Sequence, residues 1–103
     1  MKWHFTDGWL PGEFSTDLSI SDDAELTEAQ KTPFLSFACS AASKSIVLGI
    51  DPGDFMLVAN IGGSNAVTVK AIKGDSGTSV AAGKVALVIG SGTANASKIY
   101  VLN

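Results

Sequence analysis

The chain has 103 residues, enough for one domain with a single modest core. Seven lysines, and no arginine, stand against ten acidic residues, so the formal net charge is −3. Because arginine supplies the bidentate contacts to guanine and much of the phosphate binding, this composition argues against a nucleic-acid partner.

Hydrophobic residues make up 46% of the chain, which is high for a small free monomer and predicts that part of the apolar surface meets another subunit. No apolar run approaches the length of a membrane helix, and residues 1–7 show no secretory signal, so we expect a soluble protein made in a cytoplasm, with no membrane partner. Cys39 is the only cysteine, and its apolar neighbours predict a small core residue.

Residues 1–33 are interpreted as an extended acidic arm. Residues 1–30 hold one lysine and seven acidic residues, a net charge of −6, whereas residues 31–103 hold six lysines and three acidic residues, a net charge of +3. The arm also carries half of the eight aromatic residues, namely Trp3, Phe5, Trp9 and Phe14. These side chains either fold back onto the chain's own core or anchor the arm in a neighbouring molecule.

One stretch of the arm predicts a short helix. Ser21 or Asp22 is a candidate N-cap, Glu25 follows as in a capping box, and Pro33 ends the run. Such a helix of about two turns would depend on packing through Leu26 and Ala29.

Residues 34–103 predict an all-β body, a small antiparallel sandwich or jelly-roll-like barrel. Strand-like segments are separated by glycine-rich turns, of which Asp51-Pro-Gly-Asp54 is the clearest. The segments begin near residues 34, 45, 54, 66, 84 and 98.

Two of these segments, 54–60 and 84–90, are apolar on both faces. Strands of this kind are usually covered on both sides, and no helical segment lies between them to provide the cover. We therefore expect a second sheet on one side and the arm or another subunit on the other.

Residue patterns for catalysis, cofactors or metals are weak, and none is assigned. His4, the only histidine, is interpreted as packed or solvent-facing rather than as a general base, and zinc would need more ligands than His4 and Cys39. Asp22, Asp23 and Glu25 lack the spacing of a calcium loop. Asp51 and Asp54 are expected to cap their turn through side-chain hydrogen bonds.

The string Asn60-Ile-Gly-Gly-Ser-Asn-Ala-Val-Thr-Val-Lys70, with Gly74-Asp75 and Ala82-Gly-Lys-Val-Ala-Leu-Val88, resembles β-rich virion proteins of tailed bacteriophages: head decoration proteins, fibres and collar appendages. The resemblance covers about the C-terminal half and consists of strand and turn types. It implies a structural virion protein, not an enzyme, that is a homo-oligomer, with a trimer favoured. The short chain suits a capsid decoration, or cement, protein on the capsid exterior that binds and stabilises the major capsid protein.

On that resemblance, the partner-binding residues of the arm are Trp3, Phe5, Asp7, Trp9, Glu13 and Phe14. It also implies a core built from Val67, Val69, Val85, Leu87 and Ile89. The alternative is a head-fibre or appendage module that binds host-surface glycan, with Tyr100 and Asn103, or the tryptophans with Asp7, as candidate sugar contacts. A minor enzyme or inhibitor has no supporting set of residues.

Overall fold

The computed structural model describes residues 15–102, and these form nine β-strands and one short 3-10 helix. The strands are β1 Ser15–Ile20, β2 Ala24–Glu25, β3 Phe34–Cys39, β4 Lys44–Val47, β5 Phe55–Asn60, β6 Val67–Lys70, β7 Thr78–Val80, β8 Val85–Ile89 and β9 Lys98–Leu102. The 3-10 helix covers Glu28–Gln30. No helix within residues 15–102 is long and apolar enough to span a membrane.

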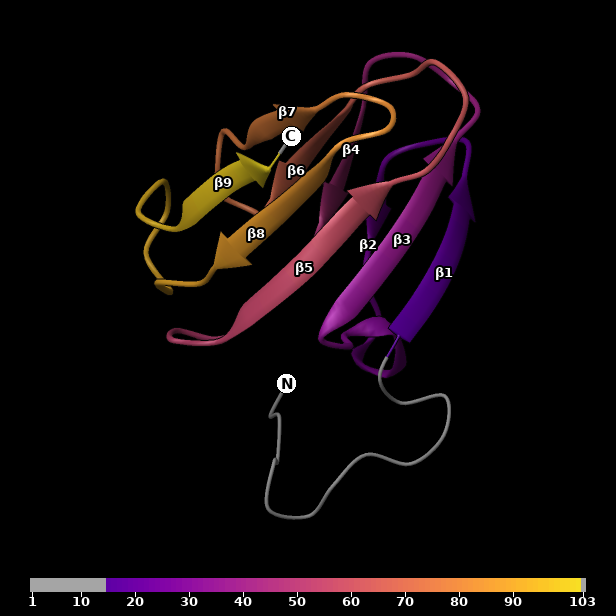
Figure 1. The fold of residues 1–103 in the computed structure, drawn as a ribbon. Coiled ribbons are helices and arrows are strands. Elements are labelled where there is room, and N and C mark those ends of the chain that lie inside the picture. Colours follow the sequence, from indigo (N-terminus) through magenta and orange to yellow (C-terminus); the bar gives the residue numbers. More distant parts are fainter. Residues whose placement is uncertain (1–14, 103) are drawn as a thin grey trace.

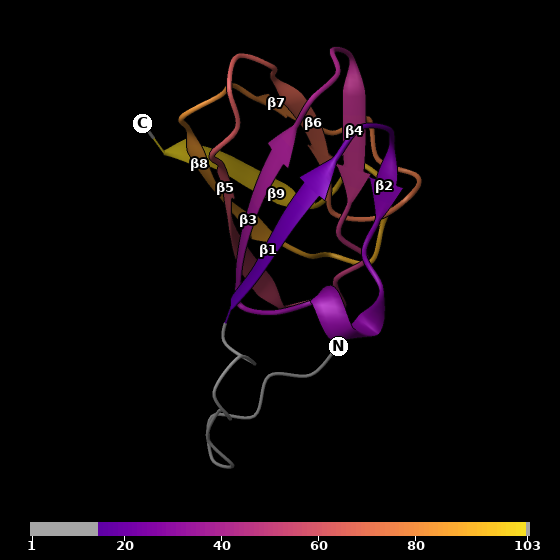
Figure 2. The same ribbon diagram turned by 90° about the vertical axis from the view of Figure 1, so that its right-hand side faces the viewer.

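The strands form two sheets that pack face to face (Figures 1 and 2). Sheet A has five strands in the order β1-β3-β5-β8-β9, and sheet B has four in the order β2-β4-β6-β7. The prediction of a small all-β sandwich is therefore confirmed.

The strand pairing differs from the antiparallel arrangement that the short turns suggested. From β1 to β6 the chain alternates between the sheets, so β1, β3 and β5 are parallel neighbours in sheet A, as are β2, β4 and β6 in sheet B. Each connection crosses to the opposite sheet. Each strand therefore runs parallel to the strand that precedes it in its own sheet. Only the later ladders, β6 with β7, β5 with β8 and β8 with β9, are antiparallel.

Residues 15–25 belong to the sandwich, so its first described strand precedes the predicted boundary between residues 33 and 34. β1 forms the edge of sheet A along the whole of β3, from Ser15 opposite Phe34 to Ile20 opposite Cys39. Leu18 and Ile20 pack against the core. Exposed and half-buried residues alternate along β1, as is typical of a strand. This strand was not predicted, because the region was interpreted as an acidic arm from its charge.

The short helix predicted between its cap at Ser21 or Asp22 and Pro33 is wrong in most of its length. Ala24 and Glu25 pair with β4, and Leu26 is buried with its backbone N–H donating to the carbonyl oxygen of Val47 at 3.0 Å. A two-turn helix is marginal in water, and pairing with a preformed sheet outweighs its weak propensity. Only Glu28–Gln30 is helical, and Gln30 Oε1 accepts the backbone N–H of Thr27 at 3.0 Å.

The core lies between the two sheets and consists of alternate residues of facing strands. Cys39 is buried there as a free thiol, as predicted. The core residues with no solvent-accessible surface include Leu35, Phe37, Ile46, Met56, Val58, Val67, Val69, Val80 and Val88. The turn before β5 is also as predicted, with Gly53 at a φ of +82°.

Candidate functional site

The outer face of sheet A, turned away from sheet B, carries an apolar row across four strands. Phe34 of β3 is in register with Leu57 of β5, Leu57 with Leu87 of β8, and Leu87 with Tyr100 of β9. The first three side chains are half-buried, and Tyr100 is 51% exposed. Since registered residues on one face of a sheet are in lateral contact, these four side chains make one continuous strip.

Further apolar residues widen this strip. Val85 and Leu102 lie in register one step along the strands, and Ile89 lies on the other side of the row. Together with the row and Phe55, which is in register with Ile89, they define what we call the apolar face: Phe34, Phe55, Leu57, Val85, Leu87, Ile89, Tyr100 and Leu102. The charged side chains nearby sit on the two edge strands, Asp17 on β1 and Lys98 on β9, so the centre of the face is uncharged.

Sheet B has the opposite character on its outer face. The residues that point away from the core there are mostly polar: Glu25, Ser45, Val47, Thr68, Lys70 and Ser79. An antiparallel or mixed sheet with one solvated face normally looks like sheet B. The apolar face of sheet A is therefore the exceptional surface of the described sandwich, and contiguous apolar patches of a few hundred Å² are often functional.

The placement of Val85, Leu87 and Ile89 on this face corrects the expectation that they build the core. The core residues of β8 are Ala86 and Val88, both fully buried. Both sets of residues are apolar, so period alone could not choose between them. Pairing decides, because Val88 is in register with Met56 and Ala86 with Val58 on the inner side of β5. For Val67 and Val69 the expectation is confirmed.

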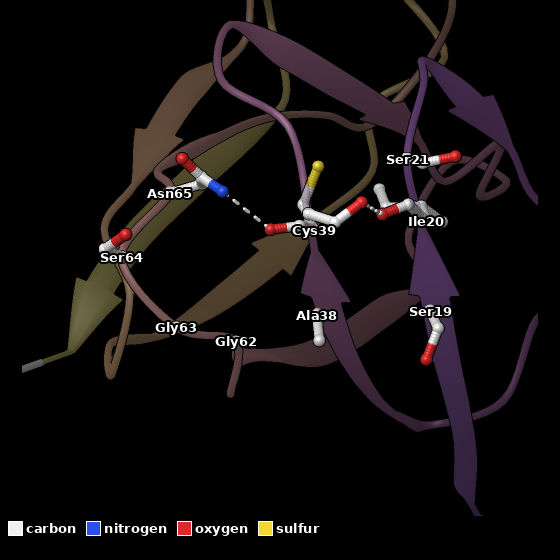
Figure 3. A pocket seen from close by; sticks show the side chains of 10 residues that line it. Ser19, Ile20, Ser21, Ala38, Cys39, Gly62, Gly63, Ser64 and Asn65 are labelled. Carbon is white, nitrogen blue, oxygen red and sulfur yellow. Dashed lines mark hydrogen bonds between the residues drawn. The ribbon is translucent and has the colours of Figure 1, made fainter.

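A surface pocket of 560 Å³ lies where the parallel strands β1, β3 and β5 end (Figure 3). Its walls come from the ends of β1 and β3 and from the loop after β5: Ser19, Ile20, Ser21, Ala38, Cys39, Ser40, Gly62, Gly63, Ser64 and Asn65. The lining carries hydroxyl, amide and backbone groups without an ionisable carboxylate or amine. Such a lining can hydrogen-bond a neutral polar ligand but offers no charged group for acid–base chemistry.

The loop that forms one wall of this pocket is fixed by two asparagines. Asn60 is 1% exposed, and its Nδ2 donates to the carbonyl oxygens of Asn65 and Val80, both at 2.9 Å. Its Oδ1 accepts the backbone N–H of Gly62 at 3.3 Å. Asn65 Nδ2 in turn donates to the carbonyl oxygen of Cys39 at 2.9 Å (Figure 3). The pocket wall is therefore held by side-chain hydrogen bonds.

Gly62 allows this loop to lie directly against β3. A Cβ atom at this position would meet the Cα of Ala38 at 2.7 Å, whereas a Cβ at Gly63 would meet nothing within 4 Å. Both glycines belong to the sequence resemblance, but only Gly62 is required by packing, because a side chain at Gly63 would have free space.

The acidic residues after β1 connect that strand to β4. Asp22 Oδ1 lies 3.2 Å from Lys44 Nζ, and Asp23 Oδ1 accepts the backbone N–H of Ser45 at 2.9 Å. The backbone N–H of Asp23 and the Lys44 ammonium hold the pKa of Asp22 below its ordinary value. Within residues 15–102 no three histidine, cysteine or acidic side chains gather as metal ligands would.

Asp54, the residue immediately before β5, differs from its predicted role as a turn cap. Its backbone N–H donates to the carbonyl oxygen of Asp51 at 3.1 Å, but among the described residues its buried Oδ2 has no hydrogen-bond partner. Burial, and secondarily the charge of Asp51, raise the pKa of Asp54. A desolvated carboxylate of this kind destabilises the folded state when it is ionised.

The residues predicted to bind a partner, Trp3, Phe5, Asp7, Trp9, Glu13 and Phe14, all lie outside the described residues, as does Asn103 of the suggested sugar contact. Sequence reasoning anticipated that β5 and β8 would present a second apolar face. It missed Phe34 and Leu102, which join that face only through the pairing of their strands. Comparison of this chain with protein-family models, with curated proteins and with solved structures finds no match.

Proposed function

We propose that this chain is a structural virion protein of the capsid decoration, or cement, type, which binds the major capsid protein and stabilises the shell from outside. The observation that carries the proposal is the apolar face of sheet A. Its row has the composition typical of protein-binding surfaces, with Leu57 and Leu87 at the centre, the rings of Phe34 and Tyr100 on either side, and charges only on the edge strands.

The sequence resemblance of residues 60–88 to β-rich phage virion proteins supports the same role. In a decorated shell, a modest contact is repeated in every copy around a symmetry axis, so contacts that are weak singly become strong by avidity. The aromatic residues Trp3, Phe5, Trp9 and Phe14 would add anchors beyond the sandwich, and a homotrimer would place three such surfaces on one capsid site.

Co-sedimentation with shells assembled from the major capsid protein of the same virus tests this function. We expect the purified chain to saturate the shells at a fixed ratio per capsid subunit and to raise their melting temperature. Leu87→Lys, which puts a charge at the centre of the apolar face, should abolish binding, whereas Ser79→Lys, at an exposed site on the outer face of sheet B, should not. Shells that stay free of the chain at saturating concentration would contradict the proposal.

Tyr100 favours one second candidate, a host-recognition module that binds glycan. Its ring is half-exposed on the apolar face, and exposed aromatic rings are common platforms for the apolar side of a sugar. A glycan array probed with the full chain separates the two functions. A cement protein should leave every glycan unbound, whereas a recognition module should bind one class and lose it in Tyr100→Ala.

A further inference from the structure

The apolar face of sheet A needs an occupant when the protein is not bound to a particle. Its centre carries Leu57 and Leu87 between Phe34 and Tyr100, and leaving such a strip in water favours aggregation. We propose that the occupant is the chain's own aromatic segment, residues 1–14, which folds across sheet A and packs Trp3, Phe5, Trp9 or Phe14 on the apolar face of the same molecule.

The position where this segment joins the sandwich supports the proposal. Residue 14 is followed by Ser15, the first residue of edge strand β1, and Ser15 is in register with Phe34 at one end of the apolar row. The segment therefore enters at the border of the face, beside its first aromatic residue.

Its length is sufficient to cross the whole sheet. Fourteen residues reach at most about 46 Å when extended. Five strands at a spacing of about 4.8 Å place β1 and β9 about 19 Å apart. The segment can thus pass over β3, β5 and β8 and still reach Tyr100, without strain and with room for the turn that Pro11-Gly12 favours.

The area of the face also favours this occupant over a second copy of the sandwich. Strands of five or six residues across about 19 Å give a flat area of about 300–400 Å², less than the roughly 800 Å² per partner of a stable pairwise interface. A contact with a shell differs in this respect, because it is repeated over many copies. Aromatic side chains bury about 150–250 Å² each, so two or three of the four in the segment match the face. Tethering removes most of the entropic cost of association, which a separate partner would have to offset.

The segment and the face are also matched in chemistry. Trp3 and Phe5 are two residues apart, so they point to the same side of an extended chain and can enter one apolar strip. The uncharged centre of the face lets the indole and phenyl rings pack while the charged residues of the segment, such as Lys2 and Asp7, remain in water. Binding to a shell would then exchange this internal cover for the capsid surface.

Intrinsic tryptophan fluorescence of the free, full-length protein tests the inference, because both tryptophans of the chain, Trp3 and Trp9, lie in this segment. We expect blue-shifted emission and protection from acrylamide quenching. Leu87→Lys should shift the emission to the red and remove the protection, whereas the matched variant Ser79→Lys, on the outer face of sheet B, should leave both unchanged. Far-UV circular dichroism checks that each variant keeps its strands, and Leu57→Ser gives a milder second perturbation of the same face.

Three results would overturn the inference. One is emission and quenching of solvent-exposed tryptophan in the folded wild-type protein. Another is protection that survives both Leu87→Lys and Leu57→Ser. The third is protection that falls on dilution, which would place the segment on a second copy instead. The measurement uses free protein alone, so its failure leaves the proposed shell binding to be judged by co-sedimentation.

Discussion

Replacing Asn60 with alanine should destabilise the sandwich more than replacing Asn65, the other asparagine that holds the pocket loop. Asn60 ends β5 inside the core region, where its side chain makes three hydrogen bonds, to Asn65, Val80 and Gly62. Asn60→Ala leaves the Val80 carbonyl buried without this partner, together with two partly buried backbone groups.

At about 1 kcal/mol for each lost hydrogen bond, the three bonds amount to about 3 kcal/mol. A domain of this size has a free energy of unfolding of about 5–15 kcal/mol, so the variant should lose a large fraction of its stability. The melting temperature should fall by about 12–24 °C, since each kcal/mol corresponds to about 4–8 °C in a domain of about 100 residues.

Urea unfolding followed by far-UV circular dichroism, with linear extrapolation to water, measures this loss. Asn65→Ala is the matched control, because it removes one hydrogen bond, to the Cys39 carbonyl, and should cost about 1 kcal/mol. Asn60→Asp should be at least as destabilising as Asn60→Ala, because it keeps the shape but removes both N–H donors and buries a charge. A change below about 1 kcal/mol for Asn60→Ala would refute the assigned network.

Two further substitutions test other local features. Gly62→Ala should destabilise the fold, because the added Cβ meets the Ala38 backbone, while Gly63→Ala, with open space, should be neutral; equal melting temperatures for the two variants would contradict the packing described. Asp54→Asn should be more stable than wild type at pH 7 in thermal melts. Since the folded-state pKa of Asp54 is raised, the wild type loses stability as the pH rises through that pKa, so the advantage of the variant should vanish on acidification; a difference independent of pH would show that ionisation of Asp54 is not its cause.

The strand positions followed from the sequence because turn chemistry is local. Pro52 and Gly53 specify a reversal whatever the chain does elsewhere, and the valines and threonine of 67–69 alternate between a buried and a half-buried side. The free, buried Cys39 likewise follows from its apolar neighbours.

Strand pairing could not be predicted in the same way, since it depends on contacts between residues distant in sequence. Whether a strand such as β3 returns parallel to β1 depends on β2 crossing to the other sheet, and β2 is only two residues long. The same limit explains the choice of face in β8, where the apolar residues Leu87 and Val88 are equally good candidates for the core until β5 supplies the register. The candidate site arises from this register. The sequence therefore predicted a second apolar face on β5 and β8, but not the residues that β3 and β9 add to it.

Reactivity of a thiol placed on the apolar face most directly tests the central claim, that this face is a binding surface covered by the aromatic segment. Cys39 is buried and should react slowly, so the thiol introduced by Leu87→Cys can be followed with a thiol reagent in the folded, full-length protein. We expect this thiol to be protected, and to become reactive when Trp3, Phe5, Trp9 and Phe14 are all replaced with serine. A thiol at position 87 that reacts as fast as one introduced by Ser79→Cys on the outer face of sheet B, with or without the four aromatic residues, would contradict the claim.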